Sequence, residues 1–146
     1  MNDALPPDVP RRLARRHLVV GWAALSLFVS LGLALEALLA FKVGAYVDVG
    51  TDTRRAMWRL AHAHGTGLAM VQIVYGLTVR SVPAAADALA SACLLAGLGL
   101  IPLGFFGGGL VVHGGDPGLL VLAVPPGAVA LAIGVARVAL AVARDR

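Results

Sequence analysis

Four side chains that can bind a metal ion or carry a proton lie inside apolar segments of this chain: Glu36, His62, His64 and His113. Ionisable groups within membrane helices are costly, so each marks a candidate site. At 1.5 Å of rise per helical residue, counting from the nearest flanking charges places all four about 5 to 9 Å below one membrane surface. The sequence therefore predicts a site at one end of the molecule, built from side chains of different helices.

The residue types favour a metal or haem centre. A carboxylate together with imidazoles is a common ligand set for iron, copper or zinc, and all four residues are candidate metal ligands. A haem held between two helices by His64 and His113 is a second geometry with the same residues. Either arrangement predicts a redox or electron-transfer role with haem or a first-row metal as cofactor.

Two other functions fit the same residues. Glu36 and His64 could form the acid–base pair of a membrane-embedded isomerase or mutase, because a carboxyl and an imidazole can pass protons to a bound substrate. A structural or assembly subunit without chemistry is the third interpretation, with the polar cluster docking a partner. His17, beside the arginines that precede the first apolar segment, is expected at the membrane interface without a site role. Gln72 and Tyr75 are expected to form hydrogen bonds between helices.

Composition places the chain in a membrane. Of its 146 residues 59% are hydrophobic and 14% are charged, too few charges to cover a soluble domain. Stretches of about 20 apolar residues, enough to cross a bilayer, predict spanning helices at 18–41, 57–79, 84–112 and 119–136. The predicted fold is all-α, a single four-helix transmembrane bundle over 17–146 after a disordered basic tail at 1–16. The lone Cys93 excludes a disulfide within the chain.

The distribution of positive charge predicts the topology. Four arginines precede the first apolar segment, which orients its start toward the cytoplasm: Arg11, Arg12, Arg15 and Arg16. Both termini are then cytoplasmic, in a multi-pass protein of a bacterial inner membrane. The basic tail is better explained by topology and anionic lipid than by nucleic acid. The predicted partner is the lipid bilayer, with a homo-oligomer or a larger membrane complex left open.

Local patterns predict how the helices meet. A stripe of mostly small residues along the first helix should face its neighbours, and it ends in Glu36: Gly21, Ala24, Phe28, Gly32 and Glu36. The glycine run 107–109 indicates either a very close helix contact or a local unwinding. Pro125 and Pro126 predict a kink in the last helix.

Two resemblances add expectations. Leu35-Glu36, Phe41-Lys42 and the run from Leu60 to Gly65, with its His-x-His motif, resemble a pattern in small uncharacterised four-helix bacterial membrane proteins. Arg16-His17-Leu18 and Ala63-His64-Gly65 are similar to segments of the hydroxylaminobenzene mutase family, also small four-helix membrane proteins. The second resemblance implies an isomerase.

Overall fold

The computed structural model describes residues 8–145, and these form helices joined by short connections. The long helices are α1 (Asp8–Ala40), α3 (Asp52–Ser81), α4 (Ala88–Leu110) and α5 (Val124–Arg144). Shorter elements are α2 (Gly44–Val47) and the 3-10 turns η1 (Val49–Thr51), η2 (Pro83–Ala85) and η3 (Leu119–Ala123). The predicted all-α class is confirmed for the described residues.

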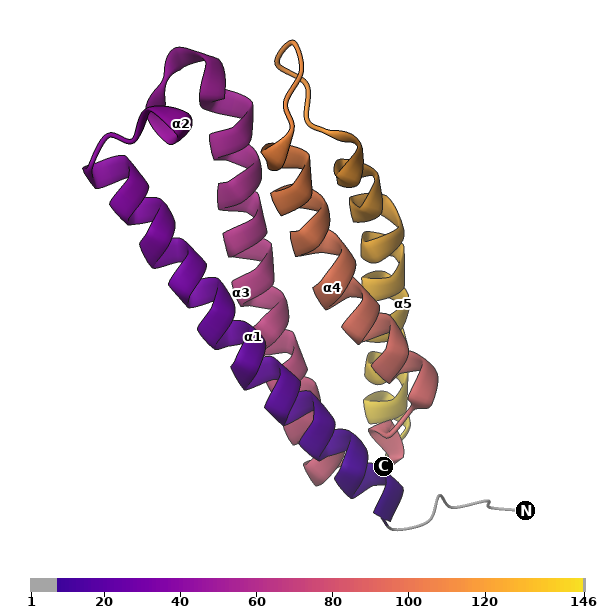
Figure 1. The fold of residues 1–146 in the computed structure, drawn as a ribbon. Coiled ribbons are helices and arrows are strands. Elements are labelled where there is room, and N and C mark those ends of the chain that lie inside the picture. Colours follow the sequence, from indigo (N-terminus) through magenta and orange to yellow (C-terminus); the bar gives the residue numbers. More distant parts are fainter. Residues whose placement is uncertain (1–7, 146) are drawn as a thin grey trace.

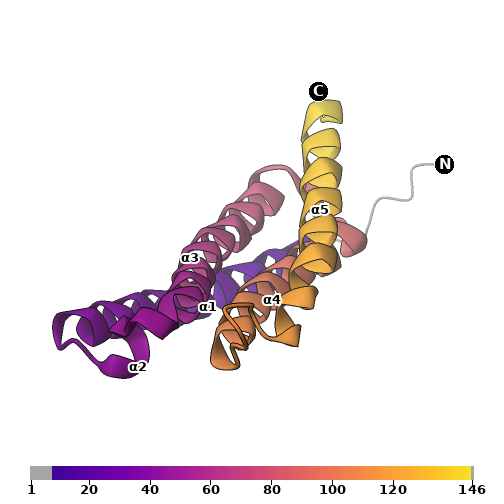
Figure 2. The ribbon, with the colours of Figure 1, turned by 90° about the horizontal axis from the view of Figure 1, so that it is seen from above.

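The four long helices form an open row, so the predicted four-helix bundle is not confirmed. Each packs on the next in chain order, α1 on α3, α3 on α4 and α4 on α5 (Figure 1). In the described chain α1 and α5, at the two ends of the row, make at most marginal contact, and Figure 2 shows α5 diverging from α1 and α3. The two central helices of the row are therefore α3 and α4.

Three of the described helices are long and apolar enough to cross a membrane: α1, α4 and the continuous segment Leu119–Arg144. Only 11% of the most apolar part of that last segment is buried within the protein. Such a large apolar surface fits an integral membrane protein. The fourth predicted span does not reach the same hydropathy, because α3 carries the arginines and histidines of residues 54–64 along with Gln72. Of these polar residues Gln72 is buried, whereas Arg59 and His64 remain exposed.

The seam between α1 and α3 is built from glycines, as the stripe on α1 predicted, but the expectation is wrong for its last residue, because Glu36 is exposed. A Cβ at Gly21 would lie 2.7 Å from Cγ1 of Ile73 and 3.0 Å from the carbonyl oxygen of Ala69. Further along the seam the ring of Phe28 fills the space beside Gly65. Because α1 approaches the backbone of α3 so closely, dispersion contacts form along the seam without large side chains.

Three expectations about helix ends need correction or refinement. The first helix begins at Asp8, so residues 8–16 are helical rather than disordered; residues 1–7 of the predicted tail lie outside the described part. Pro125 and Pro126 occupy the first turn of α5, where a missing N–H costs nothing, so they start a helix instead of kinking one. The glycines at 107–109 remain helical and buried, which selects the close-contact alternative.

Replacing Gly21 by Ala tests the glycine seam. The new methyl group would meet the backbone of α3, which cannot move aside, so unfolding in detergent should become easier by about 1–3 kcal/mol. Gly67→Ala on α3 is the matched control, since no atom lies within 4 Å of its Cβ position and alanine favours the helix. Thermal unfolding of both variants checks this; equal melting temperatures would contradict the seam.

Candidate functional site

The four predicted site residues do not form one cluster. His113 is exposed in the turn after α4, where its backbone pairs with Asp116. His64 is also exposed; its Nδ1–H donates to the carbonyl of Leu60 one turn earlier, and its ring lies against Phe105 on α4. In the described chain no three side chains of His, Cys, Asp or Glu are close enough to hold a metal ion. The structure therefore does not support the predicted metal set of Glu36, His62, His64 and His113, nor a haem between His64 and His113.

The physical reason is that depth in a membrane fixes only one coordinate. Residues at i and i+2 on a helix lie about 200° apart around the axis, so His62 turns toward α1 while His64 turns toward α4. His113 lies beyond the end of α4 at Leu110 and follows the path of the turn. Equal depth places these side chains at one level but on different sides of the row.

Glu36 and His62 are brought together. They line a hollow of about 380 Å³ at the end of the molecule where α2 lies, which we call the Glu36 hollow. Its other wall residues come from α1, α2 and α3: Gly32, Leu35, Leu39, Tyr46, Arg55 and Arg59. The hollow thus combines a carboxyl, an imidazole and two guanidinium groups with apolar walls.

Regular helix geometry produces this wall. Arg55, Arg59 and His62 follow one another at i, i+4 and i+7 and so share one face of α3. The His62 Nδ1–H donates to the carbonyl of Phe28 over 2.7 Å, and the ring lies across Gly32, where a Cβ would be 2.4 Å from its Cε1 atom. With Nδ1 engaged, an uncharged imidazole carries its lone pair on Nε2, the atom available to a ligand.

The charges of the hollow are only partly paired. Arg55 donates to the carbonyl of Tyr46 over 3.1 Å and forms an ion pair with Asp52. Among the described residues, neither Glu36 nor Arg59 has an oppositely charged side chain within ion-pair distance. The hollow therefore presents one carboxyl and one guanidinium that a ligand can engage.

Aromatic stacking holds α2 in place above the hollow. Tyr46, only 3% exposed, stacks on Trp58 at 6.2 Å between ring centroids, and Trp58 stacks on Phe106 at 5.5 Å. The indole N–H of Trp58 also donates to the carbonyl of Phe106, and Gly109 leaves room for the indole. This column links α2, α3 and α4, so the hollow has a rigid upper wall.

Sequence reasoning missed the contribution of Tyr46, Arg55 and Arg59. The sequence did contain a signal for this wall, because positions 55, 59 and 62 share one helical face and all three residues are polar. Tyr46 lies in a four-residue helix and could not be placed from any periodicity.

A second polar cluster lies around His17, at the end of the helices opposite to the Glu36 hollow. This side chain is completely buried, so its prediction as an interface residue is wrong. Its Nδ1–H donates to Oε1 of Gln72 over 2.5 Å, and its Nε2 accepts from the hydroxyl of Ser91 over 2.7 Å. Gln72 in turn donates from Nε2 to the carbonyl of Leu94 over 2.8 Å. One imidazole thus links α1, α3 and α4, and the predicted interhelical role of Gln72 is confirmed.

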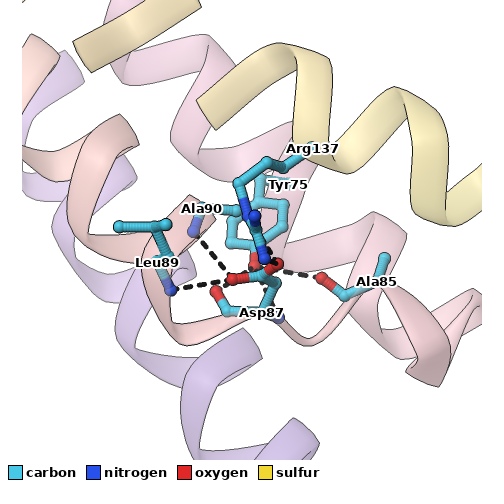
Figure 3. A network of polar contacts seen from close by, with 6 residues as sticks. All are labelled: Tyr75, Ala85, Asp87, Leu89, Ala90 and Arg137. Carbon is cyan, nitrogen blue, oxygen red and sulfur yellow. Dashed lines mark hydrogen bonds and ion pairs between the residues drawn. The ribbon is translucent and has the colours of Figure 1, made fainter. Parts of the chain in front are cut away.

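The network continues through Tyr75 to α5 (Figure 3). The ring of Tyr75 meets His17 edge to face at 4.6 Å, and its hydroxyl lies 3.1 Å from the carbonyl oxygen of Ala85 and 3.2 Å from that of Asp87. The Asp87 carboxylate caps α4 by accepting from the N–H groups of Leu89 and Ala90. It also accepts from Nε of Arg137 on α5 over 2.8 Å.

This second cluster is a scaffold. The polar side-chain atoms of His17, Gln72 and Ser91 bond to one another or to backbone, which is the condition for burying them at low cost. Burial by itself raises the pKa of Asp87, but the hydrogen bonds from Arg137, Ala90 and Leu89 outweigh it and hold the pKa below its ordinary value. The cluster fixes the helices and leaves no group free for a ligand.

No protein-family model, curated protein or solved structure matches this chain. The two resemblances noted from sequence motifs thus remain untested, and the function has to be inferred from the geometry of the sites.

Replacing His17 by Ala tests the scaffold. The change leaves the carbonyl oxygen of Gln72 and the hydroxyl of Ser91 buried without their partner and opens a cavity, so the loss of stability should be about 2–5 kcal/mol. His64→Ala is the matched control, because that histidine is exposed and bonds only within its own helix. Thermal unfolding in detergent measures both, and similar losses would show that His17 is no special link.

The pair of Asp87 and Arg137 predicts a dependence on pH. A carboxyl whose pKa is lowered by folding stabilises the folded state above its unfolded pKa, and this contribution disappears as the pH falls below about 4. Asp87→Asn keeps a good helix cap but removes the charge. Its melting temperature should be lower than that of the wild type at pH 7, and the two should converge toward pH 3. A constant difference across that range would mean that the charge contributes nothing.

Proposed function

We propose that this chain is an integral protein of a bacterial inner membrane, crossed by α1, α3, α4 and α5, with both termini in the cytoplasm. The position of α3 between α1 and α4 supports a fourth crossing, because its buried residues, Gln72 among them, pack against these two helices. The arginines at the start of α1 support the orientation. The lipid bilayer is its main partner; a homo-oligomer or a larger complex stays a prediction.

We further propose that the protein is a membrane-embedded acid–base enzyme, of the isomerase or mutase type, acting in the Glu36 hollow. The observation that supports this is the presence of Glu36 and His62 in the walls of one hollow of small-molecule size. His62 takes the place that the sequence had suggested for His64. A redox centre has less support, because its four ligands lie apart.

The chemistry follows from the positions of the groups. Arg59 would hold an anionic part of the substrate by charge-assisted hydrogen bonds. The Nε2 atom of His62, aimed by the bond from Nδ1 to Phe28, would take a proton from the substrate. Glu36, a carboxylate across the hollow on α1, would take up a proton from water and return it at a second position, while His62 releases its proton to water, and so complete an isomerisation.

Solvent deuterium tests this proposal even before the substrate is identified. An enzyme that removes and returns a proton incorporates deuterium from D₂O into a compound that passes through its site. Purified protein in lipid nanodiscs is incubated in D₂O with water-soluble and lipid extracts of bacterial cells, and the compounds are analysed by mass spectrometry. The wild type should label at least one compound.

The variants assign the roles. Glu36→Gln and His62→Asn should each lower the labelling at least about 100-fold, the usual contribution of a positioned acid or base. His64→Ala is the control and should label as the wild type does. Labelling that survives both Glu36→Gln and His62→Asn, or a wild type that labels nothing in either extract, would overturn the enzyme proposal.

A further inference from the structure

We infer that the ligand of the Glu36 hollow is a zwitterionic lipid headgroup of the phosphoethanolamine class, carrying a phosphate and a primary ammonium. The inference rests on the proposed function for the location of the site, and it names the class of molecule that the site would take. The inference is based on the charges of the hollow, on its wall residues and on its position in the molecule.

The charges come first. The hollow presents one carboxyl, Glu36, and one guanidinium, Arg59, that lack ion-pair partners among the described residues, while Arg55 is already engaged by Asp52. A ligand with a single charge would satisfy only one of the two free groups and would leave the other without a partner. A ligand with a phosphate for Arg59 and an ammonium for Glu36 satisfies both.

The Glu36 carboxylate also discriminates between ammonium groups. A primary ammonium has three N–H donors and can hydrogen-bond to the carboxylate. A trimethylammonium group has no N–H and interacts with the faces of Trp, Tyr or Phe instead, yet Tyr46, the one such residue lining the hollow, is already stacked on Trp58. The wall therefore favours ethanolamine over choline.

The apolar walls indicate a lipid rather than a free zwitterion. Leu39 lines the hollow and is 57% exposed, and Leu33, nearly two turns earlier on α1, is 63% exposed. The hollow thus lies beside exposed apolar side chains of a helix that is long enough to cross the membrane. Acyl chains of a bound lipid can follow this surface while the headgroup occupies the hollow, at the level where headgroups lie.

Native mass spectrometry of the purified protein tests this inference. The protein is released from nanodiscs that contain equal parts of phosphatidylethanolamine, phosphatidylglycerol and phosphatidylcholine. We expect the retained lipid to be enriched in phosphatidylethanolamine about tenfold over each of the others, the value of one hydrogen bond to a charged group. Glu36→Gln should abolish the preference, and Arg59→Gln should lower the retention of phosphatidylethanolamine about tenfold. Arg80→Gln, an exposed arginine at the other end of α3, is the control and should change nothing.

A second measurement separates a lipid from a soluble ligand. Glycerophosphoethanolamine has the same headgroup without acyl chains, and it should displace the bound lipid only at concentrations above those at which a short-chain phosphatidylethanolamine does so. Displacement at equal concentrations, equal retention of the three lipids, or a preference that survives Glu36→Gln would each overturn the inference. Melting temperatures near that of the wild type show that the Glu36→Gln, Arg59→Gln and Arg80→Gln variants are folded.

The two proposals can fail separately. Deuterium labelling confined to water-soluble compounds, with no lipid preference, would overturn the lipid inference and leave the enzyme intact. Selective retention of phosphatidylethanolamine without any labelling would support the ligand and overturn the catalytic role of Glu36 and His62.

Discussion

The buried imidazole of His17 is the interaction on which the arrangement of the helices depends. In an apolar environment helices gain little from hydrophobic burial against one another, and hydrogen bonds and close packing have to define their positions. His17 offers one donor and one acceptor, and Gln72 and Ser91 use both. Because the three residues belong to α1, α3 and α4, their bonds set the rotation of each helix about its own axis. A different rotation of any one of them would leave two polar groups buried and unpaired.

The rotation set at this end determines what faces what at the other end. With α1 and α3 held in register along their glycine seam, Glu36 and His62 come to the same side of the pair, with Arg55 and Arg59 above them. The aromatic column of Tyr46, Trp58 and Phe106 then closes the upper wall. The two polar sites thus differ in kind. The side chains of the scaffold cluster are bonded to one another or to backbone, whereas the Glu36 hollow keeps charged groups that can bind a ligand.

Features that depend on a single helix were predictable from the sequence. The helical class, the small-residue stripe on α1 and the hydrogen-bonding role of Gln72 all follow from periodicity and residue type. Features that depend on the angular relation between helices were not. Shared depth suggested that His64 and His113 join Glu36 and His62, whereas their directions around the helix axes differ. His17 was misjudged because the charged neighbours Arg15 and Arg16, which face away from the protein, dominate the local composition.

The hydropathy of α3 has a consequence for how the protein is made. On its own this helix is too polar to partition readily into lipid, since its arginines, histidines and Gln72 each oppose the transfer. Its neighbour α1 is synthesised first, is strongly apolar, and offers the glycine seam and His17 to the polar side of α3. In the four-span topology proposed above, the unit of membrane insertion is therefore the α1–α3 hairpin, in which the first helix offers hydrogen-bond partners to the second. His62 and Gln72 are the polar side chains of α3 that this earlier helix covers, since each forms a hydrogen bond with α1.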